Sequence, residues 1–292
     1  MSETFGVFAD RWALDAFSLM NLFAIGLAYL WGVRVCRTSG AAWPSRFTWC
    51  FLAGLALLAI AYLGPLAAWS HTFFWAHMSQ HLIVMMAAAP LLVLGNPITL
   101  WFRASSGATR RRVVVPLLRS RAVRWLLNPY LTWALFAGVL LGTHFSPFYE
   151  WALRNHDADT FIEQPLYLVV ALLFYVPLIG ANLQPRRPTP AFRLLSLAAM
   201  MVPEAVVGAV LFFASRPLYP FYDQVRPFGL APIPDQQLAG GLMWALVMVV
   251  DSGWMMVAAV EWFGDEERRS SRLDREIREQ SEQSEQSEQL PA

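Results

Sequence analysis

The sequence predicts an all-α fold, a polytopic membrane bundle of seven transmembrane helices. Hydrophobic residues make up 57% of the 292 residues and charged residues only 15%. Long apolar runs separated by short polar loops at this composition are typical of helical membrane proteins. The chain also carries 13 Trp, and indole rings gather at membrane–water interfaces.

Seven apolar runs have the length needed to cross a bilayer. A helix needs about 20 consecutive apolar residues to span the hydrocarbon core. The runs occupy residues 15–33, 47–69, 73–95, 129–145, 161–181, 192–214 and 236–263. Pro177 and Pro203 lie inside the fifth and sixth runs, where neighbouring helices can satisfy the freed carbonyl groups. We therefore expect residues 1–264 to form one seven-helix transmembrane domain.

The distribution of Arg predicts the orientation. All 22 basic residues are Arg, and only four of them, Arg11, Arg154, Arg216 and Arg226, fall on one side of the predicted membrane. The positive-inside rule then places the N-terminus outside and the C-terminus in the cytoplasm, which agrees with an odd number of crossings. The basic, amphipathic stretch 103–127 is expected to lie on the inner leaflet, in contact with membrane lipid.

The remaining composition excludes several classes of protein. Residues 265–292 are polar and end in a Ser-Glu-Gln repeat, so we expect a disordered cytoplasmic tail. The acidic N-terminus lacks the basic region of a cleaved signal peptide. Cys36 and Cys50 form no C-x-x-C motif, and a net charge of +1 gives no reason to expect a nucleic-acid partner. Nucleotide-binding and hydrolase motifs are absent from the sequence, so an enzyme is not expected.

The five His residues all map toward the outer face. His77 and His81 are four residues apart, so they share one face of a helix, and Met85 extends that stripe by a turn. At 1.5 Å per residue, His81 lies about 21 Å above the cytoplasmic end of its helix and His144 about 22 Å above that of the fourth helix. His81 and His144 could therefore meet. His71 and His156 fall in outer loops and are interpreted as loop residues.

An intramembrane pair of imidazoles favours a metal site. Polar side chains in a membrane are costly and tend to be functional, and an i, i+4 pair brings two imidazoles to one ion. Imidazole suits copper, zinc and iron, whereas thioether favours Cu(I). Met78 and Met85 are close enough to His77 and His81 to serve as ligands.

Four acidic residues have two interpretations each. Asp235 and Glu163 begin predicted helices, where a carboxylate caps the helix, but both lie on the side of the histidines and could orient an imidazole or bind the metal. Glu204 and Asp251 lie inside membrane segments, where they could serve a proton path or pair two helices.

Three functions remain open from these residues. The first is metal handling at the histidine site. The second is a haem-binding membrane redox protein, since His81 and His144 lie at matching depth on two helices. The third is a transporter of a metal or small solute, which would need a polar path to the cytoplasm; the inner half carries no His, and no inverted repeat is evident.

Several motifs resemble one family. The stretch HMSQHLIVMMAAAPLLVLGNP at 77–97, THF at 143–145, IEQPLY at 162–167 and DQQLAGGLMW at 235–244 are similar to the signature of the multi-span CtaG family of cytochrome c oxidase assembly factors. The resemblance covers about residues 15–263.

The resemblance implies a multi-pass protein of the bacterial plasma membrane. Such a protein would act with haem–copper oxidase subunits, maturing the oxidase by binding and handing on copper. The family's motifs carry over to His77, His81, His144 and Asp235. The predicted copper site therefore comprises His77, His81 and His144, with Asp235 and Met85 as further ligands. Whether the protein forms a homo-oligomer is left open.

Overall fold

The computed structural model describes residues 2–180, 188–224 and 226–288, and every regular element in these ranges is a helix. This confirms the predicted all-α fold. Six helices or continuous helical runs are long and apolar enough to cross a membrane: Ala16–Thr38, Ser45–Trp69, Phe74–Ala104, Asp159–Ile179, Pro190–Phe213 and Pro232–Arg278. The helical segments are α1 (Ser2–Asp10), α2 (Ala16–Thr38), α3 (Ser45–Leu63), α4 (Pro65–Trp69), α5 (Phe74–Leu82), η1 (Ile83–Ala88), α6 (Ala89–Leu94), α7 (Pro97–Ala104), α8 (Gly107–Thr109), η2 (Arg110–Val114), α9 (Val115–Arg119), α10 (Arg121–Leu126), α11 (Pro129–His144), α12 (Phe148–Arg154), α13 (His156–Ala158), η3 (Asp159–Glu163), α14 (Gln164–Ile179), α15 (Pro190–Phe213), η4 (Pro220–Tyr222) and α16 (Pro232–Glu288).

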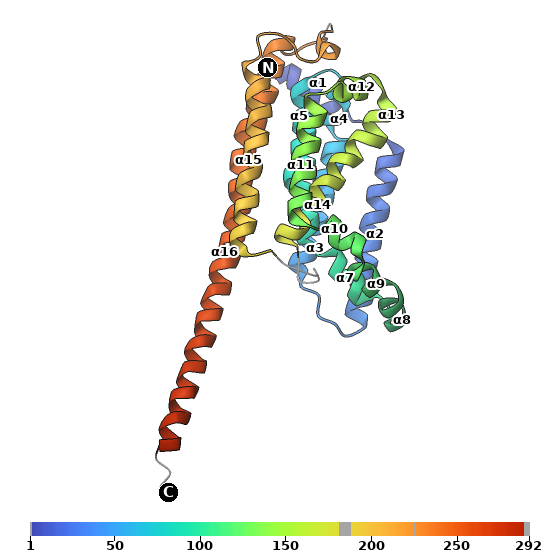
Figure 1. Cartoon of the computed structure of the whole chain (residues 1–292). Helices are drawn as coiled ribbons and strands as arrows, with labels where there is room; N and C mark the ends of the chain where they lie inside the picture. Colours follow the sequence, from blue (N-terminus) through green and yellow to red (C-terminus); the bar gives the residue numbers. More distant parts are fainter. Residues whose placement is uncertain (1, 181–187, 225, 289–292) are drawn as a thin grey trace.

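The fourth predicted crossing is the least regular. It corresponds to α11, which has 16 residues and is therefore only about 24 Å long. It makes a seventh span only together with α12, to which it is bent by 66°. The N-terminus lies at the same end of the bundle as α12 and the start of α5, whereas α7–α10 and the C-terminus lie at the opposite end (Figure 1). Which end faces the cytoplasm stays a prediction.

The helical run α5–η1–α6 is the central element. Of the candidate spans it has the largest buried share, 56%, because it packs against α3, α14 and α16. One hydrophobic cluster joins its residues to α11, α14, α15 and α16, and a second joins them to α2 and α3. A polar side chain on this run is therefore held in a dry environment on nearly every side.

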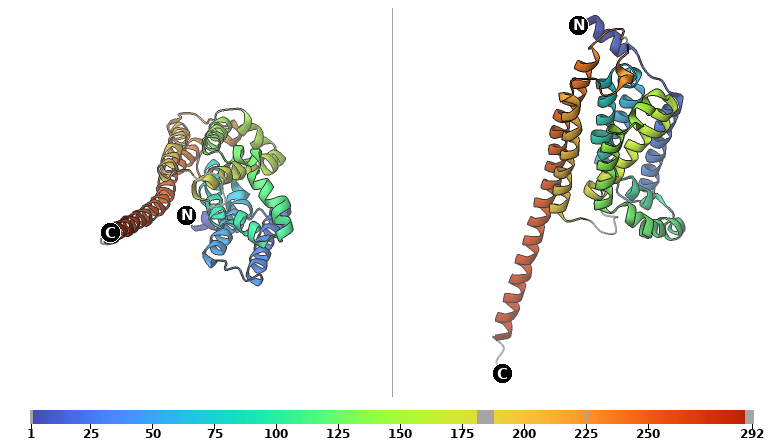
Figure 2. Two further views of the ribbon diagram at one scale, coloured as in Figure 1. Left: turned by 60° about the horizontal axis from the view of Figure 1, so that its bottom comes forward. Right: turned by 45° about the horizontal axis from the view of Figure 1, so that its top comes forward.

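The structure describes the polar C-terminal segment up to residue 288 as helix, and residues 289–292 of the expected disordered tail lie outside the described residues. α16 continues from the bundle to Glu288 without a break at residue 264 (Figure 2). Residues 266–278 are exposed, so their helical conformation depends on intrinsic helix propensity and not on packing. Glu, Gln and Arg are strong helix formers. Asp274 also stands four residues before Arg278, a spacing at which opposite charges stabilise a helix. The disorder expected of residues 265–292 stays a prediction.

Helices α15 and α16 lie side by side along one edge of the bundle (Figures 1 and 2). They approach closely at Gly208 and Gly240, in the manner of small-residue contacts between membrane helices. A Cβ atom on Gly240 would lie 2.7 Å from both the Gly208 carbonyl oxygen and the Phe212 amide nitrogen. Both neighbours are backbone atoms, so relieving the clash requires the helices to separate.

Gly240→Ala is therefore expected to destabilise the protein by about 1–3 kcal/mol, as overpacking does in other cores. Gly253→Ala, on the same helix, is the matched control because nothing lies within 4 Å of its Cβ position. Thermal unfolding of the purified variants in detergent measures the difference. Equal melting temperatures for the two variants would show that the helices part without cost.

Candidate metal centre

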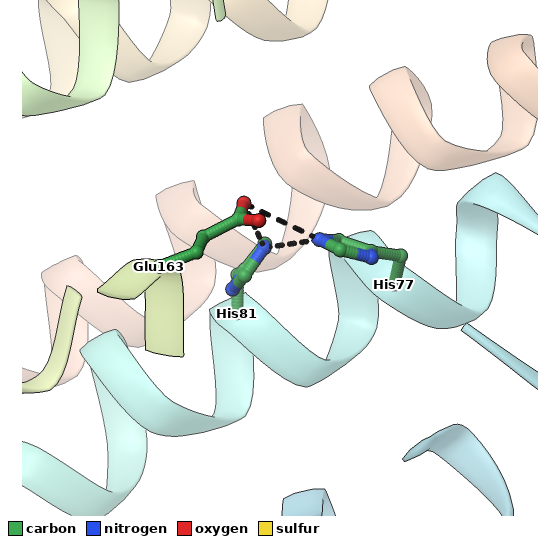
Figure 3. Close-up of side chains that lie close together, drawn as sticks. All are labelled: His77, His81 and Glu163. Atoms are coloured by element: carbon green, nitrogen blue, oxygen red, sulfur yellow. Dashed lines mark hydrogen bonds and ion pairs between the residues drawn. The ribbon is translucent and has the colours of Figure 1, made fainter. Parts of the chain in front are cut away.

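Three buried side chains converge near the start of α5. His77 and His81 come from α5 and Glu163 from the end of η3 (Figure 3). The two Nε2 atoms lie 2.5 Å apart, and Glu163 Oε1 lies 3.5 Å from His77 Nε2 and 3.2 Å from His81 Nε2. The exposed fractions of His77, His81 and Glu163 are 0%, 5% and 0%. Of the described residues, these three form a group whose ligand atoms all lie within 4.8 Å of one another.

Local backbone structure aims these side chains at one another. The i, i+4 spacing places His77 and His81 on one face of α5, as the sequence predicts. A π-helical turn, η3, ends on Glu163, and a second one, η1, begins directly after α5. Inserted π turns shift the register of a helix and frequently occur at functional sites.

The buried carboxylate of this group needs a positive charge to compensate it. Beyond the two imidazoles, Glu163 has no hydrogen-bond donor among the described residues, and His77 Nδ1 has no partner there either. A buried carboxylate between two imidazole lone pairs needs a proton or a metal ion to offset the cost of removing it from water. Two imidazoles and one carboxylate are a donor set used for zinc, iron and copper.

His144 lies beside this group and does not join it, and Met85 borders the same cavity as His144. His144 Nδ1 donates a hydrogen bond to the Leu140 carbonyl at 2.8 Å, which leaves its Nε2 without a partner among the described residues. His81, Met85 and His144 line one cavity of about 20 Å³. The predicted meeting of His81 and His144 therefore takes the form of a shared cavity. The volume of this cavity leaves no room for a haem between the two imidazoles.

Asp235 has a different role from the predicted one. It neither caps its own helix nor contacts the histidines: its carboxylate accepts hydrogen bonds from the Phe74 amide at 2.8 Å and the Trp75 amide at 3.0 Å, and pairs with Arg226 at 2.6 Å. Asp235 thus caps α5 from a distance of 161 residues in sequence and fixes the start of the helix that carries His77 and His81. It acts on the site by positioning.

Sequence reasoning left Glu163 out of the predicted ligand set and missed two tyrosines. Tyr149 is fully buried, with its ring centroid 5.2 Å from that of His77 and 5.6 Å from that of His144. Tyr167 lies 4.4 Å from His81 by the same measure. The available signal was spacing: Tyr167 follows Glu163 by four residues, so the two share a helix face directed at α5.

His71 pairs with Asp159 outside the membrane-spanning segments. Its Nε2 lies 3.1 Å from Asp159 Oδ2, and this hydrogen bond raises the pKa of His71 above its usual 6.5, while burial opposes the shift. His156, the other predicted loop histidine, begins α13, and its side chain lies outside the described ones.

The raised pKa of His71 predicts a pH dependence. The ion pair stabilises the fold fully below the unfolded-state pKa of about 6.5 and is lost as pH rises through the higher folded-state pKa. Asp159→Asn should bring the His71 pKa back toward or below its usual value and flatten the melting temperature across this window. Titration of His71 followed by NMR measures the shift. An unchanged His71 pKa in Asp159→Asn would assign the shift to another neighbour.

Taken together, the fold and the site define a multi-span helical membrane protein with a buried His–His–Glu group near one end of the bundle. The family model described as cytochrome c oxidase caa3 assembly factor (Caa3_CtaG) matches residues 27–265. The chain therefore belongs to this family, as the motifs predict, and the family is one of assembly factors.

The curated relatives are mycobacterial and uncharacterised. Proteins of Mycobacterium bovis and Mycobacterium tuberculosis are each 29% identical over 272 residues, 90% of this chain and 41% of theirs. A protein of Mycobacterium leprae is 27% identical over 276 residues, 92% of this chain and 42% of its own. The chain thus spans about two fifths of the length of these relatives. No solved structure matches it.

Proposed function

We propose that the chain assists oxidase maturation by binding copper at His77, His81 and Glu163 and releasing it to subunits of a haem–copper oxidase. The convergence of these three side chains in a dry site carries the proposal, because it provides three lone-pair donors and one compensating negative charge. Membership of an oxidase assembly family favours copper over zinc or iron, which the same donors would also suit.

Three protein donors also suit a metal that must be released. A site with three ligands keeps a position open for an incoming ligand, as open catalytic zinc sites do. His77 lies three residues after the start of α5, about 5 Å along the helix from its first residue. With the orientation that the Arg distribution predicts, this end of α5 faces outward, and a partner could approach there.

A complementation experiment tests the function. A strain lacking the chain is supplied with the wild type, His77→Ala, Glu163→Gln or His71→Ala, and oxidase activity and oxidase copper content are measured with the amount of chain in the membrane. We expect His77→Ala and Glu163→Gln to lose most oxidase activity and copper. His71→Ala, the matched outer histidine, should retain both. Normal oxidase copper with His77→Ala would overturn the proposal.

A further inference from the structure

A second group of metal-compatible side chains surrounds the cavity next to the His–His–Glu group. The cavity has a volume of about 20 Å³ and is bordered by His81, His144 and Glu204. Four of the 11 Met residues also line it: Met78, Met85, Met86 and Met243. These methionines come from α5, η1 and α16, so only the folded bundle brings them together. The volume is enough for one ion or one water molecule.

Two polar atoms at this cavity have no partner in the described part of the chain. They are His144 Nε2 and Glu204 Oε2, on side chains that are 6% and 2% exposed. Because the Nδ1 proton of His144 is donated to Leu140, Nε2 carries the lone pair of a neutral imidazole. Buried polar atoms are rarely left unpaired, and a bound ion or water molecule commonly satisfies those that lack a protein partner.

The donor atoms at this cavity are soft ligands, and the nearby carboxyl groups supply negative charge. Thioethers and a neutral imidazole select Cu(I) over Zn²⁺. Glu204 and the buried Asp251 are hydrogen-bonded to each other, which requires a proton on one of the two carboxyl groups. A single shared proton leaves the pair one negative charge, enough to offset a monovalent cation. Methionine often serves only for packing, but packing alone leaves the His144 and Glu204 atoms without a partner.

We propose that this cavity is a second metal site, selective for Cu(I), with His144 Nε2 and the thioethers of Met86 and Met243 as donors and the Glu204–Asp251 pair as counter-charge. The proposal rests on the proposed function in one respect: His81 borders both sites, so copper held at His77, His81 and Glu163 has a neighbouring position to occupy. The inner site adds a preference for the reduced ion.

X-ray absorption at the copper edge tests the site in the purified full-length chain loaded with Cu(I) without oxygen. We expect sulfur ligands in the wild type and their loss in the double variant Met86→Leu and Met243→Leu, with loss of the copper equivalent they hold. Methionine-to-leucine changes conserve volume and are well tolerated. Met200→Leu is the control, because Met200 is 1% exposed in the same core but does not border the cavity.

The results separate this site from the outer one. No sulfur ligand in the wild type, or sulfur ligation unchanged in the double variant, would overturn the inner site. Loss of sulfur ligation in the double variant supports it, and so does retention of that ligation when His77→Ala removes the copper equivalent bound at the His–His–Glu group. If His77→Ala leaves the number of bound copper ions unchanged while the double variant loses sulfur ligation, the proposed function fails and the inner site stands.

Discussion

Replacing His77 and His81 together by Leu is expected to destabilise the metal-free protein by about 3–5 kcal/mol. Both imidazoles are withdrawn from Glu163, which is fully buried and has no other partner among the described residues. Removing the partners of a buried charge while the charge remains carries a cost of this size. Thermal unfolding in detergent with a chelator present measures the change without a contribution from bound metal.

The triple variant that adds Glu163→Leu separates charge from packing. Buried ionic groups can be replaced as a set by apolar groups at little cost, so the third substitution should restore much of the lost stability. A triple variant as unstable as the double variant would show that the histidines matter for shape alone and that Glu163 needs no compensation.

Asp235→Ala is expected to cost a similar amount, about 3–5 kcal/mol, although Asp235 does not reach the candidate site. The substitution leaves Arg226, whose side chain is 7% exposed, without its ion pair, and buried pairs broken on one side carry this cost. It also removes the acceptor for the Phe74 and Trp75 amides at the start of α5. Because α5 carries His77 and His81, metal affinity should fall with stability.

Asp15→Ala is the control for the loss of stability expected in Asp235→Ala. Asp15 caps α2 from an exposed position, accepting from the Ser18 amide at 2.6 Å, and loss of such a cap costs about 1 kcal/mol. Melting temperatures of the two alanine variants, measured side by side, should therefore differ severalfold in their shift from the wild type. An Asp235→Ala shift no larger than that of Asp15→Ala would mean that solvent reaches Arg226 and the amides of α5.

The apolar runs were sufficient to predict the six long spans, because a membrane helix satisfies its own backbone and must present apolar side chains to lipid. They did not predict the bend between α11 and α12. The i, i+4 pair His77 and His81 was predictable for a similar reason: both residues lie in one helix, so their relation depends on helical geometry alone. Local periodicity therefore identified two of the three residues that converge.

The position of the third residue, Glu163, beside the two histidines depends on how the helices pack. Glu163 is far from His77 in sequence, and its place at the start of a helix looks the same whether it caps that helix or reaches a neighbour. Asp235 posed the same ambiguity, and it also reaches a neighbouring helix, but at the start of α5 and not at the histidines. His144 was placed near the correct neighbour, but the direction of its ring depends on the hydrogen bond from Nδ1 to Leu140, which depth along a helix does not specify.

Copper titration of the purified chain tests the central claim most directly. Wild-type protein and His71→Ala should compete with a copper chelator equally well. Loss of even an outer partner of a metal ligand costs about 10–100-fold in affinity, so His77→Ala and Glu163→Gln should weaken copper binding by at least this factor. Copper affinities of His77→Ala and Glu163→Gln equal to that of the wild type would contradict a metal centre at His77, His81 and Glu163.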